Sequence, residues 1–373
     1  MSDKTSIACN GKIVFTGGGT GGHVYPNLAL SAEFEKRGYY PVYIGSAHGS
    51  LEERLATQNG IPYFGIDSAK LIRSLSFDAI RKNAKIARTL CKSIKEAKRV
   101  LQAQNPCAVI SKGGFASLPT VIAARQLKLP VFAHESDMTL GLANRIAKIK
   151  GATVLKANPN ARFKGIFVGM PLRKSLFGKD KKQCMLSLGI DTRLPILLVL
   201  GGSSGAQAVN DAVLKNLNSL TRKYFVLHVT GKGKFQRIFC DNYKAYEYAD
   251  DVSLFYGASD AVLSRAGATA VFELSALNKR ALFIPLPKGI SRGDQIDNAY
   301  LAQEYGANVL FQDEGFYDNF LSAIENTFKK PPMMSICADA NGKIADIVCD
   351  RLRRGEKCKN KKPSPNGSPS FYS

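Results

Sequence analysis

The chain has 373 residues, of which 45% are hydrophobic and 22% are charged, and its formal net charge is +22. This composition excludes a disordered or collagen-like chain and suits a globular protein long enough for two domains. No stretch reaches the roughly 18 to 20 consecutive apolar residues of a membrane-spanning helix, and residues 1–12 lack the apolar core of a signal peptide. We therefore expect a cytoplasmic protein, and its positive charge predicts a polyanionic partner such as a nucleic acid, an anionic membrane or a phosphorylated substrate.

The first half of the chain alternates short apolar strands with helices. A capping-box signature, Ser50 with Glu53, predicts the start of a helix that ends before Gly60, and a longer helix is expected within 76–104. Continuous apolar strands between helices favour a parallel sheet. The strands are expected at 12–16, 41–45, 107–111, 131–134 and 153–156.

The first strand opens into a glycine-rich loop in the segment KIVFTGGGTGGH, residues 12–23. A loop of this kind between a strand and a helix lets backbone N–H groups approach phosphate oxygens. Pro26 fits the first turn of the following helix, where its missing N–H costs nothing. The loop therefore predicts a bound anion, and a plain tight turn is the alternative for this loop taken alone.

The second half of the chain repeats this arrangement. The segment PILLVLGGSSGAQ, residues 195–207, again runs from an apolar strand into a glycine-rich turn and a helix, and further strands are expected at 225–230, 261–264 and 282–285. The repeat predicts two Rossmann-like domains joined near 165–178, with ligands bound outside the carboxyl ends of the strands. Residues 357–373, rich in Lys, Pro and Ser, are expected to form a disordered basic tail.

Two other classes of protein are weighed against the composition and the glycine loops. A nicotinamide-dependent oxidoreductase is disfavoured because GGGTGGH carries extra glycines and no acidic residue ends the strand at 41–45. A non-catalytic nucleic-acid-binding protein is disfavoured because the basic residues lie beside apolar ones and no nucleic-acid module is recognised. No metal or cofactor is expected, because the histidines are far apart and neither Cys-x-x-Cys nor Asp-x-Asp occurs.

Seven motifs in collinear order resemble those of the MurG glycosyltransferases over about residues 12–353. They are GGTGGH (18–23), SKGGF (111–115), HES (134–136), GMPLR (169–173), GGSSGA (201–206), SRAGA followed by Glu273, and DQIDNA (294–299). The resemblance implies an α/β fold of the GT-B type, in which two Rossmann-like domains face each other across a cleft.

The function implied by this resemblance is a step of peptidoglycan synthesis. It is an inverting transfer of N-acetylglucosamine from UDP-N-acetylglucosamine to undecaprenyl-diphosphate-muramoyl-pentapeptide, either metal-independent or metal-stimulated. The alternative is another UDP-sugar-dependent GT-B glycosyltransferase with a lipid acceptor. Residues 10–166 are expected to bind the acceptor and the membrane, and residues 167–341 the UDP-sugar. A final helix at about 342–356 is expected to pack back on the first domain.

The donor site implied by the resemblance draws on both domains. Glu273 is expected to bind the ribose hydroxyls, Arg173 a phosphate and Gln295 the sugar hydroxyls, while the backbone of Ala249 reads the uracil. Asp137 stands where several members of the family carry asparagine, and Asp294 replaces the first of two adjacent glutamines. The full set is Thr20, Gly21, Gly22, Asp137, Arg173, Ser203, Ala249, Ala268, Thr269, Glu273 and Gln295.

The acceptor diphosphate is expected at two glycine turns. The residues of these turns are Gly18, Gly19, Gly113 and Gly114. A general base must then take the proton of the attacking hydroxyl, and it must lie within hydrogen-bond reach. His23 and Glu135 are the two candidates, and the sequence leaves the choice between them open.

A membrane contact is expected where apolar and basic side chains alternate near residues 70–85. Its residues are Leu71, Ile72, Leu75, Phe77, Arg81, Lys82 and Lys85. Such a mixture suits the surface of an anionic leaflet, and the alternative is a helix that packs its apolar side on the core. We expect a peripheral protein on the cytoplasmic face of the bacterial inner membrane, with other cell-wall synthesis proteins as further partners and no nucleic acid.

Overall fold

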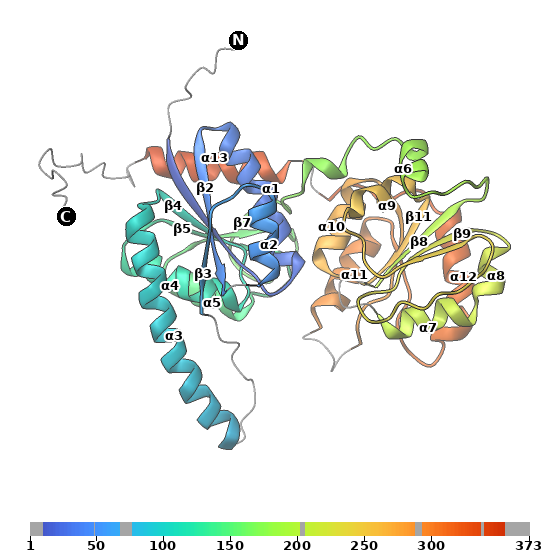
Figure 1. Ribbon diagram of the computed structural model, residues 1–373, viewed down its shortest axis with the longest axis horizontal. Coiled ribbons are helices and arrows are strands. Elements are labelled where there is room, and N and C mark those ends of the chain that lie inside the picture. The colour runs from blue at the N-terminus through green and yellow to red at the C-terminus, as the bar shows by residue number, and fades with distance from the viewer. Residues whose placement is uncertain are drawn as a thin grey trace, which may run out of the picture.

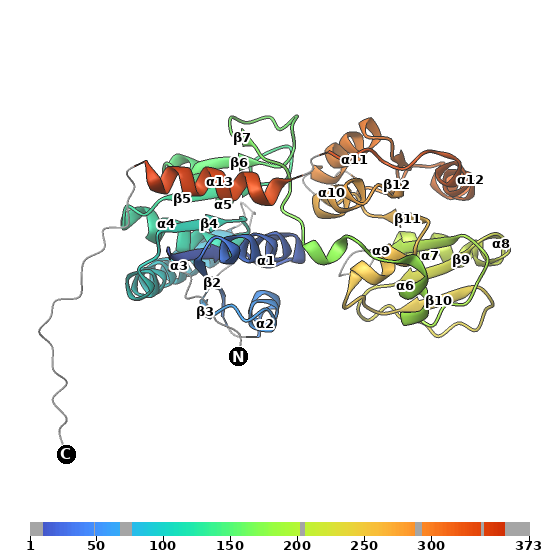
Figure 2. The same ribbon diagram turned by 90° about the horizontal axis from the view of Figure 1, so that it is seen from above.

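The computed structural model describes residues 10–47, 49–67, 77–201, 206–287, 293–336 and 339–354. In these ranges the chain forms two separate parallel sheets with helices packed on their faces (Figure 1). Seen from above, the two α/β units lie next to each other along the long axis of the molecule (Figure 2). The predicted α/β class with two Rossmann-like domains is confirmed.

The first sheet has seven strands in the order β3-β2-β1-β4-β5-β6-β7, and every neighbouring pair is parallel. Its strands are β1 (Gly11–Thr16), β2 (Tyr39–Ser46), β3 (Tyr63–Ile66), β4 (Ala108–Ser111), β5 (Val131–Glu135), β6 (Thr153–Lys156) and β7 (Ile166–Phe167). The helices between them are α1 (Gly21–Lys36), α2 (Leu51–Gln58), α3 (Phe77–Gln104), α4 (Leu118–Gln126) and α5 (Leu142–Ile149).

Strand β1 explains why this sheet reads as continuous apolar runs. Ile13 and Phe15 enter one hydrophobic cluster together with Phe34 of α1, whereas Val14 enters the cluster on the opposite face. All four side chains are fully buried. Because successive side chains of a strand point to opposite faces, a sheet covered by helices on both sides needs apolar residues at every position.

The second sheet has six strands in the order β10-β9-β8-β11-β12-β13, again all parallel. Its strands are β8 (Ile196–Leu200), β9 (Phe225–Val229), β10 (Tyr243–Tyr246), β11 (Ala261–Ser264), β12 (Arg280–Phe283) and β13 (Asn308–Val309). Its helices are α6 (Lys181–Ser187), α7 (Gln207–Lys215), α8 (Leu217–Thr221), α9 (Val252–Ala258), α10 (Ala268–Ala276), α11 (Asp294–Glu304) and α12 (Phe316–Lys329).

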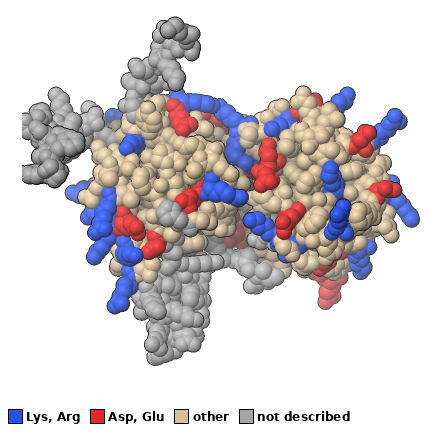
Figure 3. Space-filling model, viewed as in Figure 1, with Lys and Arg blue, Asp and Glu red and all other residues tan. Residues whose placement is uncertain are grey.

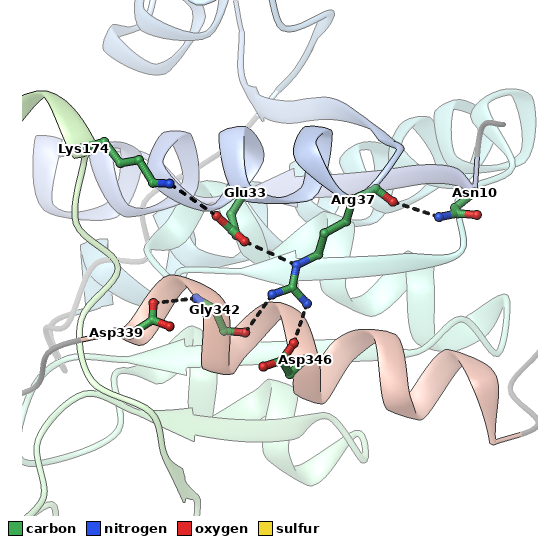
Figure 4. A network of polar contacts seen from close by, with 7 residues as sticks. All are labelled: Asn10, Glu33, Arg37, Lys174, Asp339, Gly342 and Asp346. Carbon is green, nitrogen blue, oxygen red and sulfur yellow. Dashed lines mark hydrogen bonds and ion pairs between the residues drawn. The ribbon is translucent and has the colours of Figure 1, made fainter. Parts of the chain in front are cut away.

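The last helix, α13 (Ala340–Arg353), returns to the first sheet and lies beside α1 (Figures 1 and 2). Ile344 and Val348 of α13 are fully buried in the same cluster as Phe34. The guanidinium of Arg37, the C-cap residue of α1, donates a hydrogen bond to Asp346 Oδ1 at 2.6 Å, as Figure 4 shows. Apolar packing and an ion pair therefore both attach α13 to the amino-terminal domain.

The described helices and surface bear on the expected membrane and nucleic-acid partners. Every helix in the described ranges is too short or too polar to cross a lipid bilayer. On the face shown in Figure 3, Lys and Arg side chains are spread over both domains with Asp and Glu among them. The described residues of that face therefore form no single basic stripe of the kind that tracks a nucleic-acid backbone.

Candidate active site

Two glycine turns meet at the carboxyl ends of β1 and β4. Gly19 and Gly114 have φ angles of +86° and +79°, a backbone region that favours glycine. A Cβ atom on Gly114 would lie 2.5 Å from the Gly18 carbonyl oxygen and 3.2 Å from His23 Nδ1. The two turns are therefore in direct contact, and a larger residue at 114 would force them apart.

His23 lies where these turns meet. It belongs to the first turn of α1, its side chain is half-buried, and its Nδ1 is 3.1 Å from Thr20 Oγ1. The N-terminus of α1 also faces this region, so backbone N–H groups and the helix dipole favour negative charge here. The imidazole is thus held next to a place suited to a phosphate group.

Glu135 ends β5 and is buried, with both carboxylate oxygens engaged. Its Oε1 accepts the backbone N–H groups of Ser136 at 3.0 Å and Asp137 at 3.3 Å. Its Oε2 accepts Gly141 N and Asn144 Nδ2, at 2.9 and 3.0 Å. A carboxylate has about four lone-pair sites, so these donors use its capacity. Through these hydrogen bonds Glu135 holds the loop between β5 and α5 in its conformation.

Asp137 lies in the same loop and faces the second domain. Its Oδ1 accepts a hydrogen bond from Asn298 Nδ2 of α11 at 3.3 Å. Burial raises the pKa of Asp137 to about 6, and the negative charges of Glu135 and Asp294 add to this effect. The asparagine expected from the family pattern is thus replaced by a group that titrates just below neutral pH.

The predicted donor residues Arg173 and Glu273 also lie together. Arg173 Nη2 is 3.7 Å from Glu273 Oε1, and the guanidinium lies 4.1 Å above the ring of Tyr25. Tyr256 donates its hydroxyl hydrogen to Glu273 Oε2 at 3.1 Å. Burial raises the pKa of Glu273, whereas Arg173 and Tyr256 lower it. The apolar neighbours of Glu273 in the sequence reflect the buried face of α10.

The N-terminus of α10 faces the first glycine loop. Ala268 and Thr269 form its first turn, after Gly267 as the N-cap residue. A Cβ atom on Gly22 would lie 3.2 Å from Thr269 Oγ1. Gly22 of α1 therefore approaches the predicted donor helix from the opposite domain, directly after the predicted residues Thr20 and Gly21.

Two further predicted donor residues lie in the second domain, one at the start of a helix and one on a loop. Gln295 is in the first turn of α11, and its Oε1 accepts the backbone N–H of Leu286 at 3.0 Å. Ala249 is half-buried against the core cluster just before α9.

Some predicted residues lie outside the part of the chain that the structure describes. Ser203, Leu71, Ile72 and Leu75 lie outside the described residues, as does the tail 357–373, and the side chains of Phe77, Arg81, Lys82 and Lys85 are likewise outside the description.

Sequence reasoning missed several buried polar residues next to the site. Glu52 of α2 is 1% exposed and accepts the backbone N–H groups of Gly19 and Ser46, at 3.4 and 3.3 Å. A cavity of about 520 Å³ adjoins it and is lined by Gly19, Ser50, Phe115 and neighbouring residues. In the sequence, Glu52 is next to the capping residue Glu53. This acidic pair at the start of a helix was the only feature that could have drawn attention to Glu52.

Lys112 and Asn298 were missed in the same way, although both lie inside recognised motifs. Lys112 in SKGGF is 2% exposed, and Asn298 in DQIDNA is 1% exposed. Burial of these polar groups depends on contacts with distant segments. In the described part of the chain, no cluster of His, Cys, Asp and Glu side chains has the arrangement of a metal site.

Family models match most of the chain. The glycosyltransferase family 28 N-terminal domain matches residues 13–155, and the glycosyltransferase family 28 C-terminal domain matches residues 196–347. The first range contains most of the first sheet but not its edge strand β7, and the second range contains the whole second sheet.

Curated relatives carry the name UDP-N-acetylglucosamine–N-acetylmuramyl-(pentapeptide) pyrophosphoryl-undecaprenol N-acetylglucosamine transferase. The chain is 41% identical to the one from Lachnoclostridium phytofermentans over 326 residues, which cover 85% of this chain and 90% of the relative. It is 40% identical to the one from Shouchella clausii over 311 residues, which cover 81% of this chain and 86% of the relative.

Solved structures of glycosyltransferases share the fold. The crystal structure of MurG from Acinetobacter baumannii matches with a TM-score of 0.68 at 22% identity, covering 91% of this chain and 99% of that chain. The calicheamicin glycosyltransferase CalG4 matches with a TM-score of 0.61 at 15% identity, covering 94% of this chain and 96% of that chain. At these identities the likeness concerns the fold alone.

Proposed function

The chain belongs to glycosyltransferase family 28, and from that membership we propose that it transfers N-acetylglucosamine from UDP-N-acetylglucosamine to N-acetylmuramyl-(pentapeptide) pyrophosphoryl-undecaprenol. It is a UDP-N-acetylglucosamine-dependent glycosyltransferase of peptidoglycan synthesis. The observation that carries this conclusion is 40–41% identity to relatives of that name over more than four fifths of the chain.

The donor binds on the side of the second domain. Glu273 accepts hydrogen bonds from the ribose hydroxyls, and Arg173 pairs with a phosphate of the leaving diphosphate. The 3.7 Å separation of Arg173 Nη2 from Glu273 Oε1 supports this division, because a phosphate can take guanidinium donors that the carboxylate holds loosely. The N-terminus of α10 adds backbone dipoles where negative charge develops as the bond to UDP breaks.

The acceptor binds on the side of the first domain, with its diphosphate at the two glycine turns. His23 takes the proton of the attacking hydroxyl, and the reaction inverts the anomeric centre in one displacement. The saturated carboxylate of Glu135 supports His23 as the base, since the acceptor proton would have to displace an existing donor from Glu135. The role of Glu135 is to hold the loop that carries Asp137 in its conformation.

The enzyme works as a peripheral protein on the cytoplasmic face of the cell membrane, where a polyprenyl acceptor resides. The expected contact includes Leu71, Ile72 and Phe77 with the basic residues that follow them. Apolar side chains flanked by lysines and arginines favour an anionic leaflet. Sedimentation with anionic and with neutral vesicles at two salt concentrations tests this, because the charge-dependent part of binding must weaken as salt rises.

The function itself is tested by mixing the protein with UDP-N-acetylglucosamine and a short-chain polyprenyl acceptor and measuring UDP release. We expect release that requires both substrates and a product heavier by one N-acetylglucosamine. UDP-glucose in place of the donor serves as the control. Release without acceptor, or equal use of the control sugar, would contradict the proposed reaction.

A further inference from the structure

Lys112 is a buried ammonium group that the proposed reaction does not use. It follows β4 directly, and its backbone N–H donates to the Thr16 carbonyl at 2.9 Å. The side chain is 2% exposed and passes under the first glycine loop, where a Cβ atom on Gly17 would lie 3.2 Å from Lys112 Cβ. A lysine enclosed between the two glycine turns must have its charge compensated nearby, since an isolated buried charge is strongly unfavourable.

The partners of this ammonium group lie in the loop after β5. Lys112 Nζ donates a hydrogen bond to Ser136 Oγ at 2.9 Å. Burial lowers the pKa of Lys112, and the negative charges of Glu135 and Asp137 oppose this effect. His134 also faces Lys112, but its Nε2 is 2.8 Å from the Gly169 carbonyl, and burial with the Lys112 charge holds its pKa well below the usual value. His134 is therefore neutral and adds no second positive charge beside Lys112.

Asp137 is the carboxylate through which Lys112 can affect the cleft. Both carboxylate oxygens of Glu135 accept hydrogen bonds within the loop, whereas Asp137 accepts a hydrogen bond from the Asn298 amide of the second domain. The charged groups around Asp137 are Glu135 of β5 and Asp294 of α11, which raise its pKa, and Lys112, which lowers it. Lys112 is thus the positive group beside Asp137, and its effect on this pKa is smaller than that of either carboxylate.

We propose that Lys112 is a positioning residue for the donor sugar, whose buried ammonium holds Ser136 and supplies the positive charge beside which the Asp137 carboxylate accepts the Asn298 amide across the cleft. Asn298 also donates to the Ala266 carbonyl at 3.3 Å, directly before the N-cap of α10. The contact therefore ties the loop of the first domain to the helix proposed to face the diphosphate. The inference rests on the proposed function only in taking this region as the donor-sugar side.

Removal of the positive charge tests the proposal through equilibrium binding, which needs no catalytic base. We would measure the affinity for UDP-N-acetylglucosamine and for UDP by calorimetry between about pH 5 and pH 8.5. Without the Lys112 charge, Asp137 takes up its proton at a higher pH. In Lys112→Met, the pH at which sugar-nucleotide affinity is lost on acidification should therefore rise by less than about one unit, which is less than about a tenfold change at a fixed pH. Affinity for UDP, which lacks the sugar, should change little.

A matched control is Lys12→Met. Lys12 lies at the other end of β1, is half-buried, and donates from Nζ to the neutral Gln104 Oε1 at 2.9 Å. Its removal should leave the pH dependence of binding in place. An equal shift in both variants would show a general effect of net charge and would overturn the proposal.

The double variant Lys112→Met/Asp137→Asn separates charge pairing from simple packing. An asparagine at 137 still offers an amide oxygen to Asn298 and needs no cation, so adding Lys112→Met to Asp137→Asn should cost little further affinity. A loss from Lys112→Met that is independent of pH and equally large in the Asp137→Asn background would overturn the proposal.

Thermal melting gives a readout that does not depend on substrate and covers the case in which Lys112→Met fails to fold. The pKa of Asp137 is about 6 in the folded chain and near 3.8 in an ordinary environment, so folding takes up a proton between these values and stability falls as the pH rises through that window. Asp137→Asn should therefore raise the melting temperature more at about pH 7.5 than at about pH 4. Equal effects at both pH values would overturn the titration of Asp137 and, with it, the charge pairing proposed for Lys112. Absence of UDP release by the wild type would instead reject the proposed function and leave this test intact.

Discussion

The carboxylate of Glu273 and the guanidinium of Arg173 face each other with Oε1 and Nη2 3.7 Å apart. Arg173 lies in the segment that joins the two sheets, and Glu273 lies on the buried face of α10. Their separation exceeds hydrogen-bonding distance, and Arg173 Nε is buried without a protein partner among the described residues. The pair thus has hydrogen-bonding capacity that a nucleotide can use.

Glu273 is expected to contribute to nucleotide affinity more than to the fold. Replacement of Glu273 by Ala should weaken UDP binding by about 1.5 to 3 kcal/mol, the range for hydrogen bonds to a charged group. Calorimetry with UDP and a thermal melt measure the two effects separately. Tyr256→Phe is a suitable comparison, because it removes the hydroxyl that donates to Glu273 but leaves the carboxylate. Unchanged UDP affinity in folded Glu273→Ala would contradict the ribose contact.

Tyr25 is expected to orient Arg173 through its ring. The guanidinium lies 4.1 Å above the ring centroid, and a cation–π contact of this kind is worth about 0.5 to 2 kcal/mol. Burial and the neighbouring Tyr248 raise the pKa of Tyr25 to about 12, so the ring is uncharged at neutral pH. Tyr25→Leu should lower UDP affinity by up to tenfold or somewhat more, whereas Tyr25→Phe, which keeps the ring, should lower it less. Equal losses in the two variants would assign the effect to the hydroxyl instead.

The parts of the fold that could be predicted are those in which neighbouring residues determine the outcome. The apolar runs before the glycine turns predicted β1 and β8, and their repetition predicted two parallel sheets. The edge strand β3 escaped prediction because only Ile66 in it is fully buried and Gly65 interrupts the apolar run. The edge strands β7 and β13 have two residues each, too few to show any periodicity.

The sequence likewise identified residues of the candidate site but not the contacts that they make with distant segments. The motifs named Arg173, Glu273 and His23, and the structure brings them to the facing sides of the two sheets. The state of Glu135 could not be foreseen, because Gly141 and Asn144 saturate it only after the loop has folded. The burial of Lys112 likewise depends on the loop after β1, which lies almost a hundred residues earlier in the chain.

Attachment of α13 to the first sheet is expected to depend on apolar packing rather than on the ion pair in Figure 4. Ile344 is fully buried in the cluster with Phe34, so Ile344→Ala should lower the free energy of unfolding by about 2 to 5 kcal/mol. Arg37→Met removes a pair in which Asp346 is 68% exposed, and it should cost about 1 kcal/mol or less. Chemical denaturation of the two variants makes the comparison, and a larger loss for Arg37→Met would reverse this ranking.

Substitution of His23 is expected to lower the reaction rate, whereas substitution of Glu135 is expected to lower the stability of the fold. His23→Ala should lower kcat by about 10² to 10⁴-fold, the usual contribution of a general base, while calorimetric affinity for UDP-N-acetylglucosamine stays within a few-fold. Glu135→Gln should mainly lower the melting temperature, because its amide N–H₂ would face N–H donors of the loop where the carboxylate now accepts them. Asn144→Ala is the matched control, since it removes one of those donors without changing the carboxylate.

If Glu135 were the base, Glu135→Gln would instead lower kcat by the same large factor at an unchanged melting temperature, and Asn144→Ala would leave most of the activity. That pattern, together with a small effect of His23→Ala, would transfer the role of the base from His23 to Glu135.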